Sequence, residues 1–175
     1  MSVEVVYETH STTEDNEAWI ATGSLPGRLS ATGREQARKL GERRRDDGIA
    51  VVFTSDLARA IETAEIAFAH SGLPIVEDAR LRECDYGEFN GTPDPVHDRA
   101  EHIDVPYPGG ESWRQAVERV AGFYEGLRRD RDGERVLVIG HAATRWALEV
   151  AFRGRSLEET LAEPFVWQPG WEYAL

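Results

Sequence analysis

Short apolar runs rich in β-branched residues alternate with amphipathic stretches along this chain. Four runs predict buried strands, namely Val3 to Tyr7, Ala50 to Thr54, Leu73 to Val76 and Arg135 to Gly140, and Phe165 to Leu175 could add an edge strand. Strands that alternate with helices form a mostly parallel sheet that is covered on both faces. We therefore expect an α/β fold, a three-layer sandwich with a mainly parallel central sheet and helices on both faces.

Helix starts are marked by polar residues that can cap a first turn. A Ser or Thr followed three residues later by Glu or Gln is a capping box, and three such pairs are present: Thr32 with Glu35, Ser112 with Gln115 and Ser156 with Glu159. Ser55 and Asp56 also suit a helix start, and Gly72 suits the end of that helix. A further helix is predicted over Ala142 to Phe152, and the helix after Thr32 should run to about Asp47.

Two long stretches lack regular periodicity and predict loops. Glu8 to Ser30 is polar and interrupted by glycine and proline, and loops of this length are usually functional. Residues 85–111 are rich in proline, glycine and charge, and they predict a short lid-like excursion over the end of the sheet. Because 175 residues suffice for one well-buried core, we expect residues 1–175 to form a single domain.

The chain is acidic, with 20 Lys and Arg against 32 Asp and Glu and a formal net charge of −12. Such a surface repels nucleic acid and anionic membranes. No apolar run approaches membrane-spanning length, and the first residues do not resemble a secretion signal. We therefore expect a cytoplasmic protein with no nucleic-acid or membrane partner.

Cysteine and histidine usage gives no sign of a metal. Cys84 is the only cysteine, which excludes an intrachain disulfide and a multi-cysteine site. His97 and His102 enclose two acidic residues, but their separation suits one helix face poorly and a solvated loop fits better. The sequence therefore predicts no metal and no cofactor.

Two histidines stand where predicted strands end. His10 lies just beyond the first strand, and His141 directly follows Gly140 at the end of the Arg135 to Gly140 strand. Open α/β sheets build their sites at the carboxyl ends of strands, so both imidazoles could enter one crevice.

Further motifs accompany these histidines in a fixed order. They are Glu8-Thr9-His10-Ser11-Thr12-Thr13 with Asn16, then Ser55 to Ala64, then Leu81-Arg82-Glu83 with Gly87 and Gly91, then Gly140-His141-Ala142, with a weaker match at Pro108 to Ser112. In these segments the chain resembles the histidine phosphatase superfamily, the phosphoglycerate mutase-like group. The resemblance covers nearly the whole chain at family-like spacing, which makes it far more specific than any single motif.

The resemblance implies three catalytic residues. His10 would attack phosphorus and become transiently phosphorylated, since a neutral imidazole is nucleophilic and its phosphoramidate is labile to water. His141 would donate a hydrogen bond to the oxygens of the transferring phosphoryl group. Glu83 stands where the family keeps its proton donor, with Asp85 and Glu88 as competitors for that role. Alone, a histidine at a strand end would more often be structural, and it is the set of motifs that favours catalysis.

The same resemblance implies a phosphate-binding set, with one departure. Arg59 lies one turn into its predicted helix, where a guanidinium could form two charge-assisted bonds to phosphate oxygens. Thr13 and Asn16 keep the family pattern and could also bind these oxygens. The family's first motif is Arg-His-Gly, whereas this chain has Thr9-His10-Ser11. Losing one charge-stabilising donor typically costs about 10²–10³ in rate.

Three groups could compensate for the missing arginine. Thr9 could donate a neutral hydrogen bond, the loop residue Arg28 could reach in, or Arg145, one turn beyond His141, could help. Ser11 in place of glycine would also be strained if its position required a positive φ.

We expect a phosphomonoester hydrolase that acts through a phosphohistidine on a small phosphorylated metabolite, with activity reduced by Thr9. The region after Glu83 is short for the family, which disfavours a phosphoglycerate-type mutase. The competing hypothesis is an attenuated or inactive pseudophosphatase that only binds a phosphorylated ligand, although pure binding needs no proton donor. Asp94, His97 and Tyr107 of the excursion could select the leaving group, and the sequence leaves open a homodimer.

Overall fold

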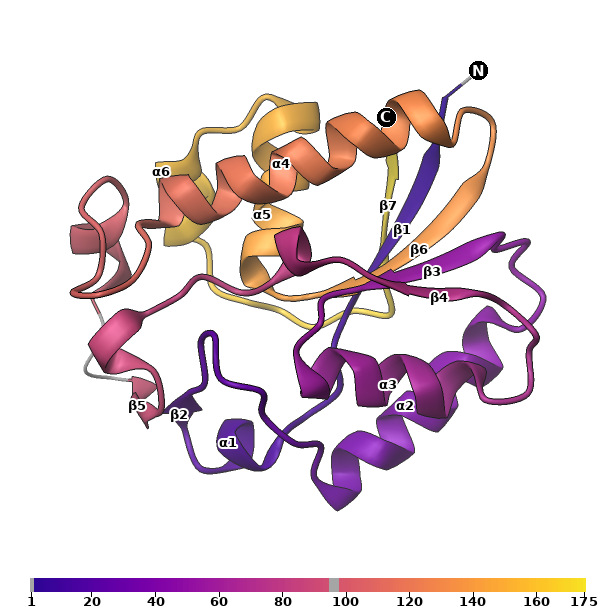
Figure 1. Ribbon diagram of the computed structural model, residues 1–175, viewed down its shortest axis with the longest axis horizontal. Coiled ribbons are helices and arrows are strands. Elements are labelled where there is room, and N and C mark those ends of the chain that lie inside the picture. The colour runs from indigo at the N-terminus through magenta and orange to yellow at the C-terminus, as the bar shows by residue number, and fades with distance from the viewer. Residues whose placement is uncertain (1, 95–97) are drawn as a thin grey trace.

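A five-stranded sheet runs through the centre of the computed structural model, which describes residues 2–94 and 98–175 (Figure 1). Its strands, in spatial order, are β4 (Ile75–Glu77), β3 (Val51–Thr54), β6 (Arg135–Gly140), β1 (Glu4–Thr9) and β7 (Trp171–Ala174). Neighbouring strands are parallel, except that β7 runs antiparallel to β1 at the edge. The mainly parallel sheet expected from the sequence is therefore confirmed.

Helices cover both faces of this sheet. On one face lie α2 (Ala31–Arg44) and α3 (Ala58–Phe68), and on the other lie α4 (Trp113–Asp130), α5 (Ala142–Arg153) and α6 (Leu157–Ala162) (Figure 1). The three-layer arrangement follows from the strand sequences, because β6 sends alternate side chains to opposite faces. Val136 and Val138 pack with α4 and α5, whereas Leu137 and Ile139 pack with α2 and α3.

The loops contain short ordered elements that the sequence pattern did not resolve. They are α1 (Glu14–Glu17), β2 (Ile20–Ala21), β5 (Thr92–Pro93) and the 3₁₀ turns η1 (Ala79–Leu81), η2 (Gly87–Phe89) and η4 (Arg99–His102). β2 and β5 pair antiparallel, which ties the loop after β1 to the excursion after Glu83. The predicted loop also begins too early, because Glu8 and Thr9 still belong to β1.

Two helix starts differ from the sequence prediction. The N-cap of α2 is Ser30 and not Thr32, because the Ser30 hydroxyl accepts the Gly33 N–H at 3.1 Å. The N-cap of α3 is Leu57, which provides no side-chain cap. In contrast, the capping boxes that begin α4 and α6 are confirmed.

Ser55 and Asp56 do not cap α3 because their side chains bond elsewhere. The Ser55 hydroxyl lies 2.7 Å from Nε2 of His141, and Asp56 forms a forked ion pair with Arg82. The residues that local propensity assigned to a helix cap are therefore committed to long-range contacts at the end of the sheet.

None of the helices formed by residues 2–94 and 98–175 combines the length and apolar character needed to cross a membrane.

Candidate functional site

The sheet places His10 and His141 side by side. Thr9 and Gly140 are register partners at the ends of the adjacent parallel strands β1 and β6, and the His10 N–H donates to the Gly140 carbonyl at 3.0 Å. The two imidazole ring centroids are 5.1 Å apart. Equal register on neighbouring parallel strands therefore brings together two residues that lie far apart in the sequence.

The geometry around His10 selects one tautomer. Its Nδ1 lies 2.8 Å from the Ser11 carbonyl oxygen, which can only accept, so Nδ1 carries the proton and donates. Burial, aided by the nearby charge of Arg59, lowers the pKa of His10 to about 3. At neutral pH the imidazole is uncharged and Nε2 holds a lone pair, which is the state that a nucleophile requires.

In His141 it is Nε2, and not Nδ1, that has a hydrogen-bond partner among the described residues. It is 1% exposed, and its Nε2 lies 2.7 Å from the Ser55 hydroxyl. That hydroxyl accepts the Leu57 N–H at 3.4 Å, and it can donate its own proton to Nε2. Nδ1 then carries the imidazole proton, and it has no hydrogen-bond partner among the residues that the structure describes.

The pKa of His141 lies well below its ordinary value, chiefly because of burial and further because of the nearby charge of Arg59. The imidazole is therefore a neutral donor. A buried N–H without a partner, next to the His10 imidazole, is suited to a negatively charged oxygen.

Glu83 is held at the amino terminus of α5, directly after His141. Its Oε2 accepts the Ala142 N–H at 3.1 Å, and its Oε1 accepts the N–H groups of Ala143 at 3.1 Å and Cys84 at 3.0 Å. The first N–H groups of a helix favour a carboxylate, so these contacts fix the Glu83 side chain in one orientation.

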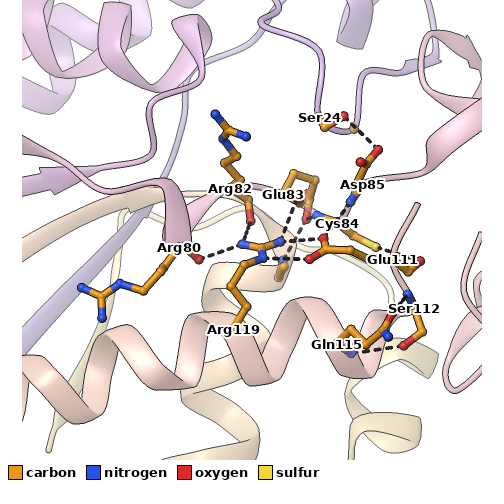
Figure 2. Close-up of polar contacts among 12 residues, drawn as sticks. Ser24, Arg80, Arg82, Glu83, Cys84, Asp85, Glu111, Ser112, Gln115 and Arg119 are labelled. Carbon is orange, nitrogen blue, oxygen red and sulfur yellow. Dashed lines mark hydrogen bonds and ion pairs between the residues drawn. The ribbon is translucent and has the colours of Figure 1, made fainter. Parts of the chain in front are cut away.

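A brace from α4 fixes the backbone that carries Glu83, as Figure 2 shows. The Arg119 guanidinium donates to the carbonyls of Arg80 at 2.8 Å, Arg82 at 3.1 Å and Glu83 at 3.3 Å. It also forms a forked pair with the carboxylate of Glu111, at 2.8 and 2.7 Å. One planar side chain therefore satisfies three backbone acceptors and locks this segment against α4.

Arg59 lies in the first turn of α3 and is 2% exposed. Its Nη1 donates to the Leu25 carbonyl at 2.6 Å, and its Nη2 donates to the Gly23 carbonyl at 2.8 Å. Its buried Nε has no partner within the described parts of the chain. The loop carbonyls thus hold the guanidinium in place and leave its Nε–H available for a ligand.

These groups line a small pocket of about 140 Å³. Its lining includes His10, Asn16, Arg59, Glu83, Asp94 and Arg99. Four of the site residues expected from the sequence, His10, Asn16, Arg59 and Glu83, are therefore brought together. His141 does not line this pocket, but its ring centroid lies 5.1 Å from that of His10. The pocket has the size of a phosphoryl group with a few waters, and it combines two arginines, an imidazole and two carboxyl groups.

Thr13 and Thr9 occupy different positions from these residues. The Thr13 hydroxyl is buried and accepts the Asn16 N–H at 2.9 Å, while Asn16 Oδ1 accepts the Thr13 N–H at 3.0 Å, so the two form the capping box of α1. Thr9 lines a separate neighbouring cavity of about 480 Å³, which also reaches His10. Its buried hydroxyl has no partner among the described residues.

Two arginines that could have replaced the missing cation lie elsewhere. Arg28 pairs with Glu14 at 2.9 Å, and the Arg145 guanidinium lies 4.6 Å from the centroid of the Trp171 ring. Neither lines the pocket that His10 shares with Arg59.

Ser11 is not strained. Across residues 2–94 and 98–175, Trp19 is the only non-glycine residue with a positive φ. The Ser11 N–H donates to the Thr63 hydroxyl at 3.0 Å. The strain expected from replacing glycine by serine is therefore absent, because this backbone position lies in a region open to any residue.

Of the two histidines of the excursion, His97 lies outside the described residues. Within the described parts of the chain, no group of three or more His, Cys, Asp or Glu side chains is placed to hold a metal ion.

The sequence did not predict the roles of several residues of the site. Ser55 and Glu111 lay inside quoted motifs, so their presence was visible although their roles as the partners of His141 and Arg119 were not. Nothing in the sequence distinguished Arg119 from the other arginines of its amphipathic helix. Arg99 was not distinguished either, because it stands in a segment without periodicity.

The two neutral imidazoles predict acid lability of the fold. Below pH 6.5 an unfolded histidine takes up a proton that folded His10 and His141 resist, so the free energy of unfolding falls as the pH falls from about 6.5. We expect His10 to cost about 2 kcal/mol between pH 7 and pH 5, and His141 to add a loss in the same direction. Urea unfolding of wild type, His141→Asn and the exposed-site control His70→Gln across this range measures the slope. A slope equally steep in His141→Asn would contradict the assignment.

Comparison with known proteins agrees with this geometry. A family model described as "Histidine phosphatase superfamily (branch 1)" matches residues 9–165. A 2,3-bisphosphoglycerate-dependent phosphoglycerate mutase of Parvibaculum lavamentivorans is 33% identical over 175 residues, covering 90% of this chain and 83% of the relative. The uncharacterized phosphatase PhoE of Bacillus subtilis is 33% identical over 146 residues, covering 83% of this chain and 75% of the relative.

The solved structures agree as well. That of Bacillus stearothermophilus YhfR superposes with a TM-score of 0.83 at 26% identity, and the match covers 95% of this chain and 88% of that one. The family model spans most of the sequence, and its match includes His10, Arg59, Glu83 and His141. The protein belongs to the histidine phosphatase superfamily.

Proposed function

We propose that the protein is a phosphomonoester hydrolase that acts through a phosphohistidine at His10 on a small phosphorylated metabolite. One observation carries the proposal: the Ser11 carbonyl fixes the proton on Nδ1 of His10, so that Nε2 is the free nitrogen beside a pocket lined by Arg59 and Glu83. A tautomer set by a backbone acceptor is the arrangement that an imidazole nucleophile requires.

The first half of the reaction transfers the phosphoryl group to the enzyme. Nε2 of His10 attacks phosphorus while the bond from phosphorus to the leaving oxygen breaks. Protonated Glu83 gives its proton to that oxygen, so the product leaves as an alcohol. The Nδ1–H of His141 and the Nε–H of Arg59 stabilise the charge on the phosphoryl oxygens.

The second half returns the enzyme to its starting state. Water attacks the phosphohistidine, the nitrogen–phosphorus bond breaks, and the electron pair returns to Nε2 of His10. The Glu83 carboxylate accepts the proton of the attacking water and is then ready to act as an acid again. The products are inorganic phosphate and the free enzyme.

Hydrolysis is favoured over mutase chemistry by the short segment between Glu83 and α4. Relatives of similar identity carry mutase and phosphatase names, so the names alone do not decide. A mutase must hold a sugar-acid phosphate close enough to exchange its phosphoryl group with the enzyme, whereas a hydrolase must admit water. The short excursion and the small pocket suit the second task better.

A binding-only pseudophosphatase is the second candidate, and it is favoured by Thr9 at the position of the motif arginine. The retained carboxylate of Glu83 argues against it, because binding a phosphate does not require a proton donor.

The direct test is turnover of p-nitrophenyl phosphate, with labelled phosphate trapped on the protein by rapid quenching. We expect release of inorganic phosphate and a label that survives alkali but is lost in acid, as a phosphoramidate would be. Incubation with 3-phosphoglycerate and 2,3-bisphosphoglycerate should yield phosphate rather than 2-phosphoglycerate. Phosphate binding without turnover or labelling would instead establish the pseudophosphatase.

A further inference from the structure

A second arginine lines the phosphate pocket and was not expected from the sequence. Arg99 begins η4, in the excursion after Glu83, and shares the pocket with His10, Arg59 and Glu83. The part of the excursion before Arg99 is tied to the first loop, because the Asp94 N–H donates to the Trp19 carbonyl at 2.9 Å. Arg99 therefore approaches the pocket from the excursion, whereas the family's motif arginine would approach from the end of β1.

The charges of the pocket favour a second cation. Glu83 and Asp94 are the acidic side chains of the lining, Arg59 and Arg99 are the basic ones, and His10 is neutral. With Glu83 protonated, as the proposed first step requires, Asp94 balances the charge of Arg59, so without Arg99 the pocket would have no net positive charge inside a protein of net charge −12. Such a site would attract a phosphomonoester dianion only weakly.

The loop engages most of the Arg59 guanidinium. Three of its five N–H groups donate to the carbonyls of Leu25, Pro26 and Gly23, so only part of it is left for a ligand. The side chain of Arg99 is 47% exposed, and its ion pair with Asp94 engages Nη2 at 3.2 Å. The remaining N–H groups of this guanidinium can reach two oxygens of one phosphate in the forked geometry typical of arginine.

We propose that Arg99 supplies the phosphoryl-binding charge that Thr9 lacks, so that the cation has moved from the end of β1 to the excursion. This inference rests on the proposed phosphotransfer at His10 and names a further group that binds the transferring phosphate. It also accounts for the replacement of the motif arginine alongside retention of His10, Glu83 and His141.

The test is a double-mutant cycle of wild type, Arg99→Gln, Thr9→Arg and the double variant. Inorganic phosphate binding is measured by calorimetry, and kcat/KM is measured with p-nitrophenyl phosphate. We expect Arg99→Gln to weaken phosphate binding at least about 10-fold and to lower kcat/KM about 10²–10³-fold. With arginine at position 9, the same substitution should cost less than about 10-fold, because the two cations serve one phosphate.

Two further variants serve as controls. Arg99→Lys keeps the charge and should lose less than Arg99→Gln, which keeps the proposal testable if Thr9→Arg fails to fold. Arg38→Gln removes an exposed arginine that pairs with Glu35 on α2, and it should behave as wild type.

The outcomes separate this inference from the hydrolase proposal. Equal losses in both backgrounds, or unchanged phosphate binding in Arg99→Gln, would overturn the role of Arg99 even if the wild type is an active phosphatase. Phosphate binding that depends on Arg99 without any turnover would uphold that role while rejecting the hydrolase. Absence of both binding and turnover in the wild type would reject both.

Discussion

Replacing His10 by asparagine is expected to lower turnover of any phosphomonoester by about 10⁴-fold or more, because the reaction then lacks its nucleophile. Asparagine keeps a polar group of similar reach, so the Ser11 carbonyl can retain a donor and the loop need not move. Steady-state turnover and the acid-labile label should disappear together.

Phosphate binding separates loss of chemistry from loss of the site. Arg59 and Arg99 supply the charges of the pocket and remain in the His10→Asn variant, so inorganic phosphate should bind within about 10-fold of wild type. The exposed control His70→Asn should keep full activity. Residual turnover above about 1% of wild type in His10→Asn would show that another group attacks phosphorus.

The pH profile provides a second check on the same nucleophile. An ordinary histidine would lose its lone pair below about pH 6.5, but burial and Arg59 lower the pKa of His10 to about 3. Protonation of His10 therefore should not limit kcat/KM at pH 5, although the fold itself becomes less stable there.

The strand pattern predicted the sheet well because β-branched runs and two-sided burial are local signals. Arg135 to Gly140 forms β6 with the predicted boundaries, and the alternate facing of its side chains follows from the pleat. The position of His141 at the end of that strand then placed it next to His10, since parallel neighbours end at the same edge. Periodicity therefore sufficed for the two central residues of the site.

Helix starts and orienting contacts could not be predicted in the same way. Serine is a common helix cap. The Ser55 hydroxyl is instead hydrogen-bonded to His141, which lies 86 residues away in the chain. Thr13 fits a phosphate-binding motif, yet its hydroxyl caps α1. Hydroxyl groups bond to whatever the tertiary structure brings within reach, and local sequence does not contain that information.

The compensation for Thr9 was hidden for a related reason. Arg28, in the loop after β1, and Arg145, one turn beyond His141, were the arginines expected to compensate, but they contact Glu14 and the Trp171 ring. Arg99 reaches the pocket through the pairing of β2 with β5, which folds the excursion back onto the first loop. The sequence pattern does not predict this pairing, because both strands are short and lie in irregular segments.

Glu83→Gln is expected to cost about 10²–10⁴-fold with alkyl phosphates such as glycerol phosphate, because an alkoxide leaves poorly without a proton. Nitrophenolate needs no proton to leave, so the first half of the reaction with p-nitrophenyl phosphate should slow by less than about 10-fold. The second half still requires a base for water. Stopped-flow measurements should therefore show a burst of nitrophenolate followed by slow turnover, with the phosphohistidine accumulating.

This dependence on the leaving group distinguishes a proton donor from a structural residue. Glutamine cannot accept the Ala142 and Ala143 N–H groups with both ends, so some loss of order at the start of α5 is unavoidable. Such disorder would slow both substrates alike, whereas loss of the acid slows the alkyl ester selectively. Glu88→Gln removes an exposed carboxylate of the same segment and should affect neither substrate. Equal losses with both substrates in Glu83→Gln would show that a group other than Glu83 transfers the proton.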